Sequence, residues 1–384
     1  MIEHNMSSTS NANPVRSVLE DSSRIQEQKA QREFYIDRLR SVMIALVILL
    51  HTAITYGASG LWFYQEREPS GAPSSMLLTT FTATNQAYFM GFLFLLAGYF
   101  TPASLERKGY GRFLGDRFLR LGLPLLSFGL ILGPLTAALV TSAQGHGFWP
   151  TISYLWQHKQ FISGPLWFTQ ALLIFTLVYC AWRAALGAPL AESQRTPRPI
   201  PAYFWWLVSA LGVVAGAITL RQFVPVGQMV FGLQLGFFAS YIFLFAVGIA
   251  AWRYDWLRQL SWNHARPWIW ALFIAWPCMP VVSAVARALN SPDKPNFSGG
   301  FSWPAILYAL WEPFVAWGLI AALLLFGVHC VSCLPRVEQH QMAGTIQAKP
   351  LSCAWNLHTR TKDAPSRTNT GPMIFGVNVD YSDN

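Results

Sequence analysis

The sequence is poor in charged residues and in cysteine. Asp, Glu, Lys and Arg make up 12% of its 384 residues, whereas soluble proteins contain about 25%. Hydrophobic residues make up 53%, and the mean hydropathy is +0.32. This composition excludes an ordinary soluble globule and favours an integral membrane protein. The five cysteines are an odd number and form no disulfide framework of the secreted type.

Several motifs of soluble enzymes are also missing. No P-loop, GxSxG or GxGxxG context is present. The net charge of +9 is spread over loops rather than gathered in a basic domain, so we expect no nucleic-acid partner. A lone CxxC, Cys330 to Cys333, stands beside His329, with His340 as a loose fourth ligand. A structural zinc site needs four firm ligands, so we expect no metal and no bound cofactor.

Apolar runs dominate the chain. A membrane helix needs about 20 apolar residues, and the sequence predicts an all-α, polytopic transmembrane bundle with about eight spans. The loops 60–83 and 144–165 are predicted to be external, with aromatic residues at the membrane interface. The eight predicted runs are 40–57, 84–104, 118–142, 166–186, 202–221, 229–251, 267–288 and 303–329.

Loop charge predicts the orientation. Lys and Arg crowd the segments before the first run and after the second, fourth and sixth runs, and the alternate loops hold few. The positive-inside rule therefore places the N-terminus in the cytoplasm, in a multi-pass protein of a bacterial-type inner membrane. Residues 1–33 are polar, and we expect a disordered cytoplasmic segment there rather than a signal peptide. No internal repeat is visible, which counts against an inverted-repeat transporter.

One helix face of the first run carries three ionisable side chains. Arg40 and His51 are eleven residues apart, which is three turns plus roughly 20° and a rise of about 16 Å. Arg40 is thus expected at the cytoplasmic edge and His51 near the middle of the membrane, with Asp37 on the same face. Buried ionisable groups usually face a functional interior. The alternative is that His51 is a structural hydrogen-bonding residue and Arg40 a snorkelling anchor.

Two further candidates lie in other runs. Glu312 stands about nine residues into the run 303–329, roughly 14 Å deep, where it either orients His51, binds acceptor or pairs structurally with an arginine such as Arg287. Trp167 and Phe168 open the run 166–186 and are candidates for stacking on a sugar. Their alternative role is in the aromatic belt at the interface.

Three segments, in order, resemble the membrane acyltransferase-3 family. The first is Asp-Arg-Leu-Arg followed by His51, and the second is 93–126, with Gly98 and an Arg-x-x-Arg pair, Arg117 and Arg120, ahead of Pro124. The third, GPLWFTQALLIF, is similar to the opening of a middle helix in the periplasmic-glucan succinyltransferase branch. The resemblance covers about 34–329, the expected membrane domain.

The resemblance implies an enzyme that transfers an acyl group, acetyl or succinyl, from cytoplasmic acyl-CoA to a hydroxyl of an extracytoplasmic glycan or lipid-linked sugar. His51 would be the general base or would itself be acylated, with Glu312 as a second catalytic residue. Arg40, Arg117 and Arg120 would bind the donor's phosphates, with Asp37 supporting Arg40. Without the resemblance, Arg117 and Arg120 would be ordinary cytoplasmic anchors. Trp167 and Phe168 would bind the acceptor.

The segment 330–384 does not fit this family. Members usually carry about ten membrane helices, and 330–384 contains no further apolar run. We interpret it as an atypical, disordered cytoplasmic tail that arose from a frameshift or a misannotated reading frame. Two other functions stay open from the residues alone: a transporter or flippase of a lipid-linked sugar, and a membrane sensor in which His51 titrates.

Overall fold

The computed structural model describes residues 42–60, 62–143, 145, 147–187, 196–289 and 295–333, with side chains through 326. Regular structure in these segments is helical, apart from one isolated bridge between Val230 and Leu233. The segments 1–33 and 334–384, for which the sequence predicts disorder, lie outside the described residues. The helices are Val42–Thr55, α2 (Pro73–Arg117), η1 (Phe118–Gly122), α3 (Leu123–Ser127), η2 (Phe128–Leu132), α4 (Gly133–Ala143), α5 (Phe148–Gln157), η3 (Gly164–Leu166), α6 (Trp167–Ala185), α7 (Tyr203–Phe223), η4 (Leu235–Phe237), α8 (Phe238–Arg253), α9 (Trp256–Gln259), α10 (Trp262–Ala275), α11 (Cys278–Leu289) and α12 (Trp303–Cys333).

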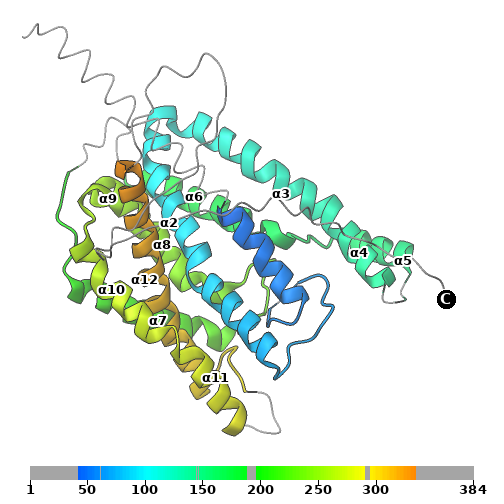
Figure 1. Cartoon of the computed structure of the whole chain (residues 1–384). Coiled ribbons are helices and arrows are strands. Elements are labelled where there is room, and N and C mark those ends of the chain that lie inside the picture. The colour runs from blue at the N-terminus through cyan, green and yellow to red at the C-terminus, as the bar shows by residue number, and fades with distance from the viewer. Residues whose placement is uncertain are drawn as a thin grey trace, which may run out of the picture. The chain divides into compact units, whose positions relative to one another are not determined.

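The prediction of an all-α polytopic membrane bundle is confirmed. Within the described residues, six helices are long and apolar enough to cross a membrane. One of them, Pro73–Ala143, contains two of the predicted runs, and the shorter helix Val42–Thr55 contains the first. The eight apolar runs therefore all fall on helices (Figure 1).

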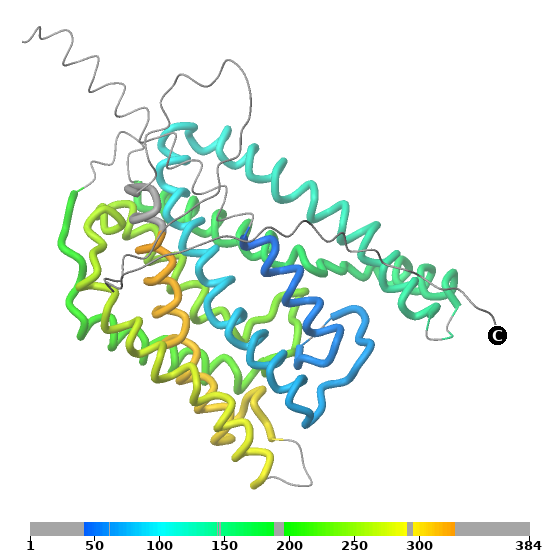
Figure 2. Tube along the Cα trace, in the orientation of Figure 1, coloured from blue at the N-terminus to red at the C-terminus, as the bar shows by residue number. Residues whose placement is uncertain are grey.

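The long helix Pro73–Ala143 bends at Gly109. This residue has φ 71° and ψ 167°, a conformation that is essentially restricted to glycine. Beyond the bend, two π-helical segments, η1 and η2, precede Pro124 and Pro134. A proline has no N–H to bond the carbonyl four residues earlier, so the helix shifts its hydrogen-bond register at these points instead of ending. The bend and the π segments turn this part of the chain away from the start of α2 (Figure 2).

The centre of the bundle is a close crossing of α2 and α8. A Cβ atom added to Gly98 would lie 2.2 Å from the carbonyl oxygen of Phe245, and one added to Gly248 would lie 2.1 Å from that of Leu95. Small residues at such crossings let two backbones approach, which strengthens helix packing inside a membrane. α12 packs against α2, α7 and α10 beside this crossing, and Val42–Thr55 packs on the start of α2 through Leu50 and Phe81.

Two segments predicted as external loops contain helix. α2 begins at Pro73, within the predicted loop 60–83, because proline suits the first helical position. In the predicted loop 144–165, α5 begins after Gly147 and buries Ile152. The aromatic residues expected at the interface are exposed there, Trp149 by 73% and Trp156 by 60%.

Two predicted runs have different boundaries in the structure. The run 229–251 becomes helical only at Leu235, because Gly227 and Gly232 adopt positive φ and turn the chain before it. The run 267–288 is two helices, α10 and α11, since Pro277 lacks the N–H that a continuous helix would need. Both differences in helix boundary arise from the backbone properties of glycine and proline, which a count of apolar residues does not include.

Candidate functional site

His51 lies in the last turn of its helix. The helix Val42–Thr55 ends in a Schellman motif, in which the Gly57 N–H donates to Ile54 O and the Ala58 N–H donates to Ala53 O. Gly57 has φ 111°, which favours glycine, and this choice of residue stops the helix one turn after His51. The imidazole is therefore presented beside the following loop, and it is half-buried.

The backbone fixes the tautomer of this imidazole. Nδ1 of His51 lies 2.8 Å from the carbonyl oxygen of Val47. A carbonyl oxygen only accepts, so Nδ1 carries the proton, and in the neutral ring Nε2 is left with a free lone pair. This is the form that a general base or a nucleophile requires.

Trp62 packs against the His51 ring. The two ring centroids are 3.8 Å apart at an interplanar angle of 41°. The loop that carries Trp62 is tied to the helix end, since the N–H groups of Glu66 and Arg67 donate to Thr55 O. Sequence reasoning treated this aromatic segment as an interfacial anchor and missed the contact, because nothing in the pattern shows how the loop folds back.

A buried ion pair forms a second polar centre. The Arg221 Nη2 atom lies 2.5 Å from the Glu312 Oε2 atom, and the side chains are 2% and 11% exposed. The Arg221 Nε–H donates to Gly236 O at 3.0 Å, and the guanidinium lies 5.2 Å from the centroid of the Phe237 ring. Charges this deep in a membrane bundle are costly, so a pair here points to a functional interior.

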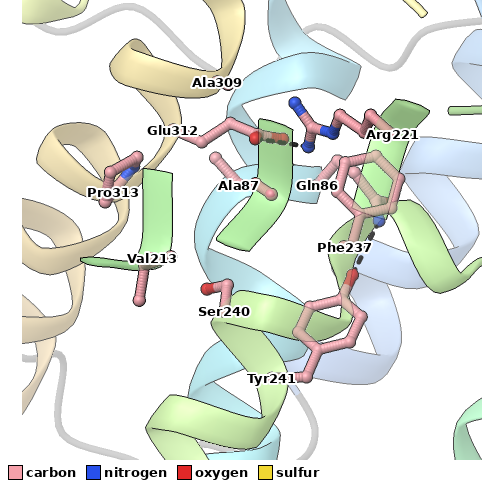
Figure 3. A pocket seen from close by; sticks show the side chains of 11 residues that line it. Gln86, Ala87, Val213, Arg221, Phe237, Ser240, Tyr241, Ala309, Glu312 and Pro313 are labelled. Atoms are coloured by element: carbon pink, nitrogen blue, oxygen red, sulfur yellow. Dashed lines mark hydrogen bonds and ion pairs between the residues drawn. The ribbon is translucent and has the colours of Figure 1, made fainter. Parts of the chain in front are cut away.

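A small cavity lies next to this pair, between α2, α7, α8 and α12 (Figure 3). Its volume is about 10 Å³, roughly the space of one water. Its wall also contains Gln86 and Tyr241, and the Gln86 amide donates to the Tyr241 hydroxyl at 2.9 Å. Among the described residues, Arg221 Nη1 and Glu312 Oε1 have no hydrogen-bond partner. On the arginine side, the pair thus retains the two N–H donors of Nη1.

The alternative in which Glu312 pairs with an arginine is confirmed, but the partner is Arg221 rather than Arg287. The Arg287 Nη1 atom donates instead to the carbonyl oxygen of Ser70 at 3.2 Å. Arg221 is the last residue of the predicted run 202–221, and in the structure it belongs to α7 and is buried. Between the described residues, no hydrogen bond joins Glu312 to His51. No direct contact in this part of the chain therefore supports the suggestion that Glu312 orients His51. Its catalytic role stays a prediction.

Two of the proposed donor-binding residues, Arg117 and Arg120, lie beyond the Gly109 bend. Arg117 is half-buried with its guanidinium 5.1 Å from the centroid of the Phe113 ring, and Arg120 is exposed on η1. Asp37 and Arg40 lie outside the described residues, so the predicted stripe with His51 stays a prediction.

The proposed acceptor-binding aromatics are packed inside the bundle. Trp167 is 8% exposed and stacks on Tyr241 with ring centroids 5.9 Å apart. Phe168 packs on Phe94, with centroids 4.8 Å apart. Much of both rings is thus already in contact with protein, and their role in acceptor binding stays a prediction.

A known family pattern described as an acyltransferase domain matches residues 33–336 of this chain. The chain belongs to the acyltransferase-3 family. The match includes the His51 helix, both π segments and the ion pair between α7 and α12. Together with its apolar helices, it identifies a multi-pass membrane protein of this family.

Among the curated proteins to which the chain is similar are two from Escherichia coli. Both are named glucans biosynthesis protein C, one from Escherichia coli strain SMS-3-5 / SECEC and one from Escherichia coli O6:K15:H31 strain 536 / UPEC. Each is 26% identical over 157 residues, which is 40% of this chain and 39% of the relative. The match thus spans well under half the length of these relatives. No solved structure matches the chain.

Proposed function

We propose that this protein transfers an acyl group, acetyl or succinyl, from acyl-CoA to a hydroxyl of a glycan or lipid-linked sugar. This makes it an acyltransferase for groups other than aminoacyl groups. The family assignment supports the reaction class, and the name of the relatives supports a glucan as acceptor. The observation that carries the proposal is the 2.8 Å distance between Nδ1 of His51 and Val47 O, from which we infer a lone pair on Nε2.

His51 acts on the acceptor hydroxyl in the simplest form of this reaction. Nε2 takes the hydroxyl proton while the oxygen bonds to the thioester carbonyl carbon. The carbon–sulfur bond then breaks, and the proton passes to the departing thiolate to give CoA. In the other form, Nε2 itself bonds to the carbonyl carbon and the carbon–sulfur bond breaks to release the CoA thiolate. The acceptor oxygen then bonds to the same carbon as the carbon–nitrogen bond breaks, and the hydroxyl proton passes to the thiolate to give CoA. Both forms use the same lone pair on Nε2, but only the second passes through an acyl-histidine. Chemical trapping of an acyl-histidine therefore distinguishes them.

The donor is held by arginines in this proposal. The phosphates of CoA are polyanionic, and a guanidinium fork matches a phosphate geometrically. Arg120 is exposed and Arg117 half-buried near the bend at Gly109, on the side that loop charge predicts to be cytoplasmic. We expect Arg40 and Asp37 to complete this donor site from the segment before the first helix.

The acceptor approaches from the loop side. His51 stands one turn before the loop at 57–72, and Trp62 from that loop already lies on its ring. A tryptophan next to the reacting nitrogen is a stacking surface for a sugar ring. Trp62 is therefore a further acceptor-binding candidate, alongside Trp167 and Phe168.

The test is acyl transfer across sealed membranes. Proteoliposomes that contain the full chain receive labelled acetyl-CoA or succinyl-CoA on one side and an oligoglucan on the other. We expect label to appear on the glucan, with one equivalent of free CoA released on the donor side. Transport of the glucan without CoA release would contradict the proposal and favour a flippase.

A further inference from the structure

A larger cavity has a lining that shares no residue with the cavity beside the ion pair. It has a volume of about 120 Å³ and is partly open. Its walls come from the N-terminal parts of α7 and α10, the C-terminal parts of α8 and α12, and the short helix α9 that connects α8 to α10. Of the proposed catalytic, donor and acceptor residues that the structure describes, none lines it.

The cavity wall is almost entirely hydrocarbon and indole. Four tryptophans line it, and three edge-to-face contacts connect them, with ring centroids 6.1 Å, 6.0 Å and 5.1 Å apart. Most other lining side chains are Leu, Ile, Val, Ala or Pro. Such a wall gives water too few polar partners, so hydrocarbon is the better occupant. The four tryptophans are Trp206, Trp256, Trp268 and Trp317.

The other two lining side chains are polar, but protein groups engage them. The Tyr203 hydroxyl donates to the carbonyl oxygen of Asn263. Nδ1 of His264 lies 2.8 Å from the Ser261 hydroxyl. These bonds hold the two polar groups to the start of α10. The cavity therefore provides few hydrogen-bond partners for a polar ligand and a large apolar contact surface for an alkyl chain.

Exposed arginines are close in the sequence to several lining residues of this cavity. Four exposed arginines each stand within two residues of a lining residue in the sequence. One of them, Arg258, pairs with Asp255 at 3.6 Å, and Arg198 has its guanidinium 4.9 Å from the centroid of the Tyr254 ring. All four arginines are exposed at the surface of the bundle. The four arginines are Arg198, Arg253, Arg258 and Arg266.

We propose that this cavity binds one acyl chain of an anionic membrane phospholipid, with the lipid phosphate among these arginines. The apolar wall selects the chain, and charge complementarity selects the anionic headgroup. This lipid site is separate from the transfer reaction, so its failure would leave the proposed function intact. The test has two competing outcomes. In one, a zwitterionic lipid binds through its acyl chain alone; in the other, lipids contact all the helices without preference.

Photolabelling of the full chain in vesicles tests the proposal. The vesicles contain a trace of phosphatidylglycerol or phosphatidylcholine with a diazirine near the end of one acyl chain, and mass spectrometry locates the labelled peptides. We expect label from phosphatidylglycerol to concentrate on α9, α10 and the second half of α12. Label spread evenly over the apolar helices would overturn the proposal.

A cavity-filling variant makes the test specific. Ala321→Trp puts an indole into the cavity, whereas Ala215→Trp adds the same group to an exposed position on α7. Label on the cavity peptides should be lost in Ala321→Trp and unchanged in Ala215→Trp. Equal labelling of the two variants would overturn the proposal.

Charge variants test the headgroup and do not change the packed interior. Arg266→Gln should lower the preference for phosphatidylglycerol over phosphatidylcholine about five-fold, the effect of one basic charge near an anionic surface. Arg112→Gln, also exposed but located beyond the Gly109 bend, is the matched control and should keep the preference. An unchanged preference in Arg266→Gln and in Arg253→Gln would overturn the anionic part of the proposal.

Discussion

Replacing Glu312 by glutamine removes one charge of the buried ion pair and keeps the shape of the side chain. The guanidinium of Arg221, 2% exposed, is then left without a counter-charge. Replacing Arg221 by methionine removes the guanidinium and leaves the Glu312 carboxyl without a counter-charge. The two changes are not equivalent, because a carboxyl without its partner can take up a proton and become neutral, whereas a guanidinium stays charged.

The size of the effect follows from the geometry. Two unit charges 2.5 Å apart attract by about 7 kcal/mol at an effective dielectric constant of ~20. Desolvation costs several kcal/mol for each ion, so the complete pair adds little net stability over an apolar pair. Removing one partner leaves that cost uncompensated, and about 3–5 kcal/mol of stability should be lost in Glu312→Gln. Arg221→Met should lose less, and the double variant should lose less than Glu312→Gln.

The assay is reversible unfolding in mixed detergent micelles, with the free energy of unfolding measured for wild type, both single variants and the double variant. The coupling energy of this cycle should be at least about 2 kcal/mol. Asp116→Asn breaks the partly exposed pair of Asp116 with Lys108 and should change stability far less. Additive effects of the two single variants would refute the reasoning, since they would mean that the charges do not stabilise each other.

Further variants test the backbone and the His51 surroundings. Gly98→Ala forces a Cβ against the α8 backbone and should cost about 3 kcal/mol of unfolding free energy, whereas Gly115→Ala has open space and should stabilise its helix by up to about 1 kcal/mol. Equal stability of the two would contradict the close crossing. Gly109→Ala should cost about 1–3 kcal/mol in the same assay because its conformation suits only glycine, and Gly111→Ala, also in open space, serves as its control. Trp62→Ala should slow acyl transfer about ten-fold by freeing the imidazole, whereas Trp62→Phe should retain most of the rate; identical rates would show that the ring contact has no role.

The fold class follows from the sequence because a bilayer imposes one rule. Backbone groups inside a membrane must bond within their own segment, so long apolar runs become helices. The boundaries depend on local chemistry that hydropathy does not measure. Pro73 starts a helix, Pro277 divides one, and Pro124 shifts a hydrogen-bond register without ending its helix. Proline thus has three different effects on helices in this one chain, and hydropathy alone does not distinguish them.

The site was predictable only in part. His51 stands out as an imidazole in an apolar run, and Glu312 as a carboxyl in another. Arg221 was missed because it stands at the end of its run, where an arginine usually snorkels. Trp62 was missed because its contact depends on a loop fold. A carboxyl deep in a bundle requires a partner, so a search of all arginines at helix ends would have included Arg221.

The most direct test of the account compares His51→Gln with His158→Gln in the acyl-transfer assay. His158 is a matched control, since its Nδ1 also lies 2.8 Å from the carbonyl oxygen four residues back and its ring lies against Tyr154, but it is exposed at the end of α5. We predict that His51→Gln lowers the initial rate at least about 100-fold, the effect of losing a general base, and that His158→Gln leaves it unchanged. Equal rates in the two variants, with both proteins folded, would contradict a catalytic His51.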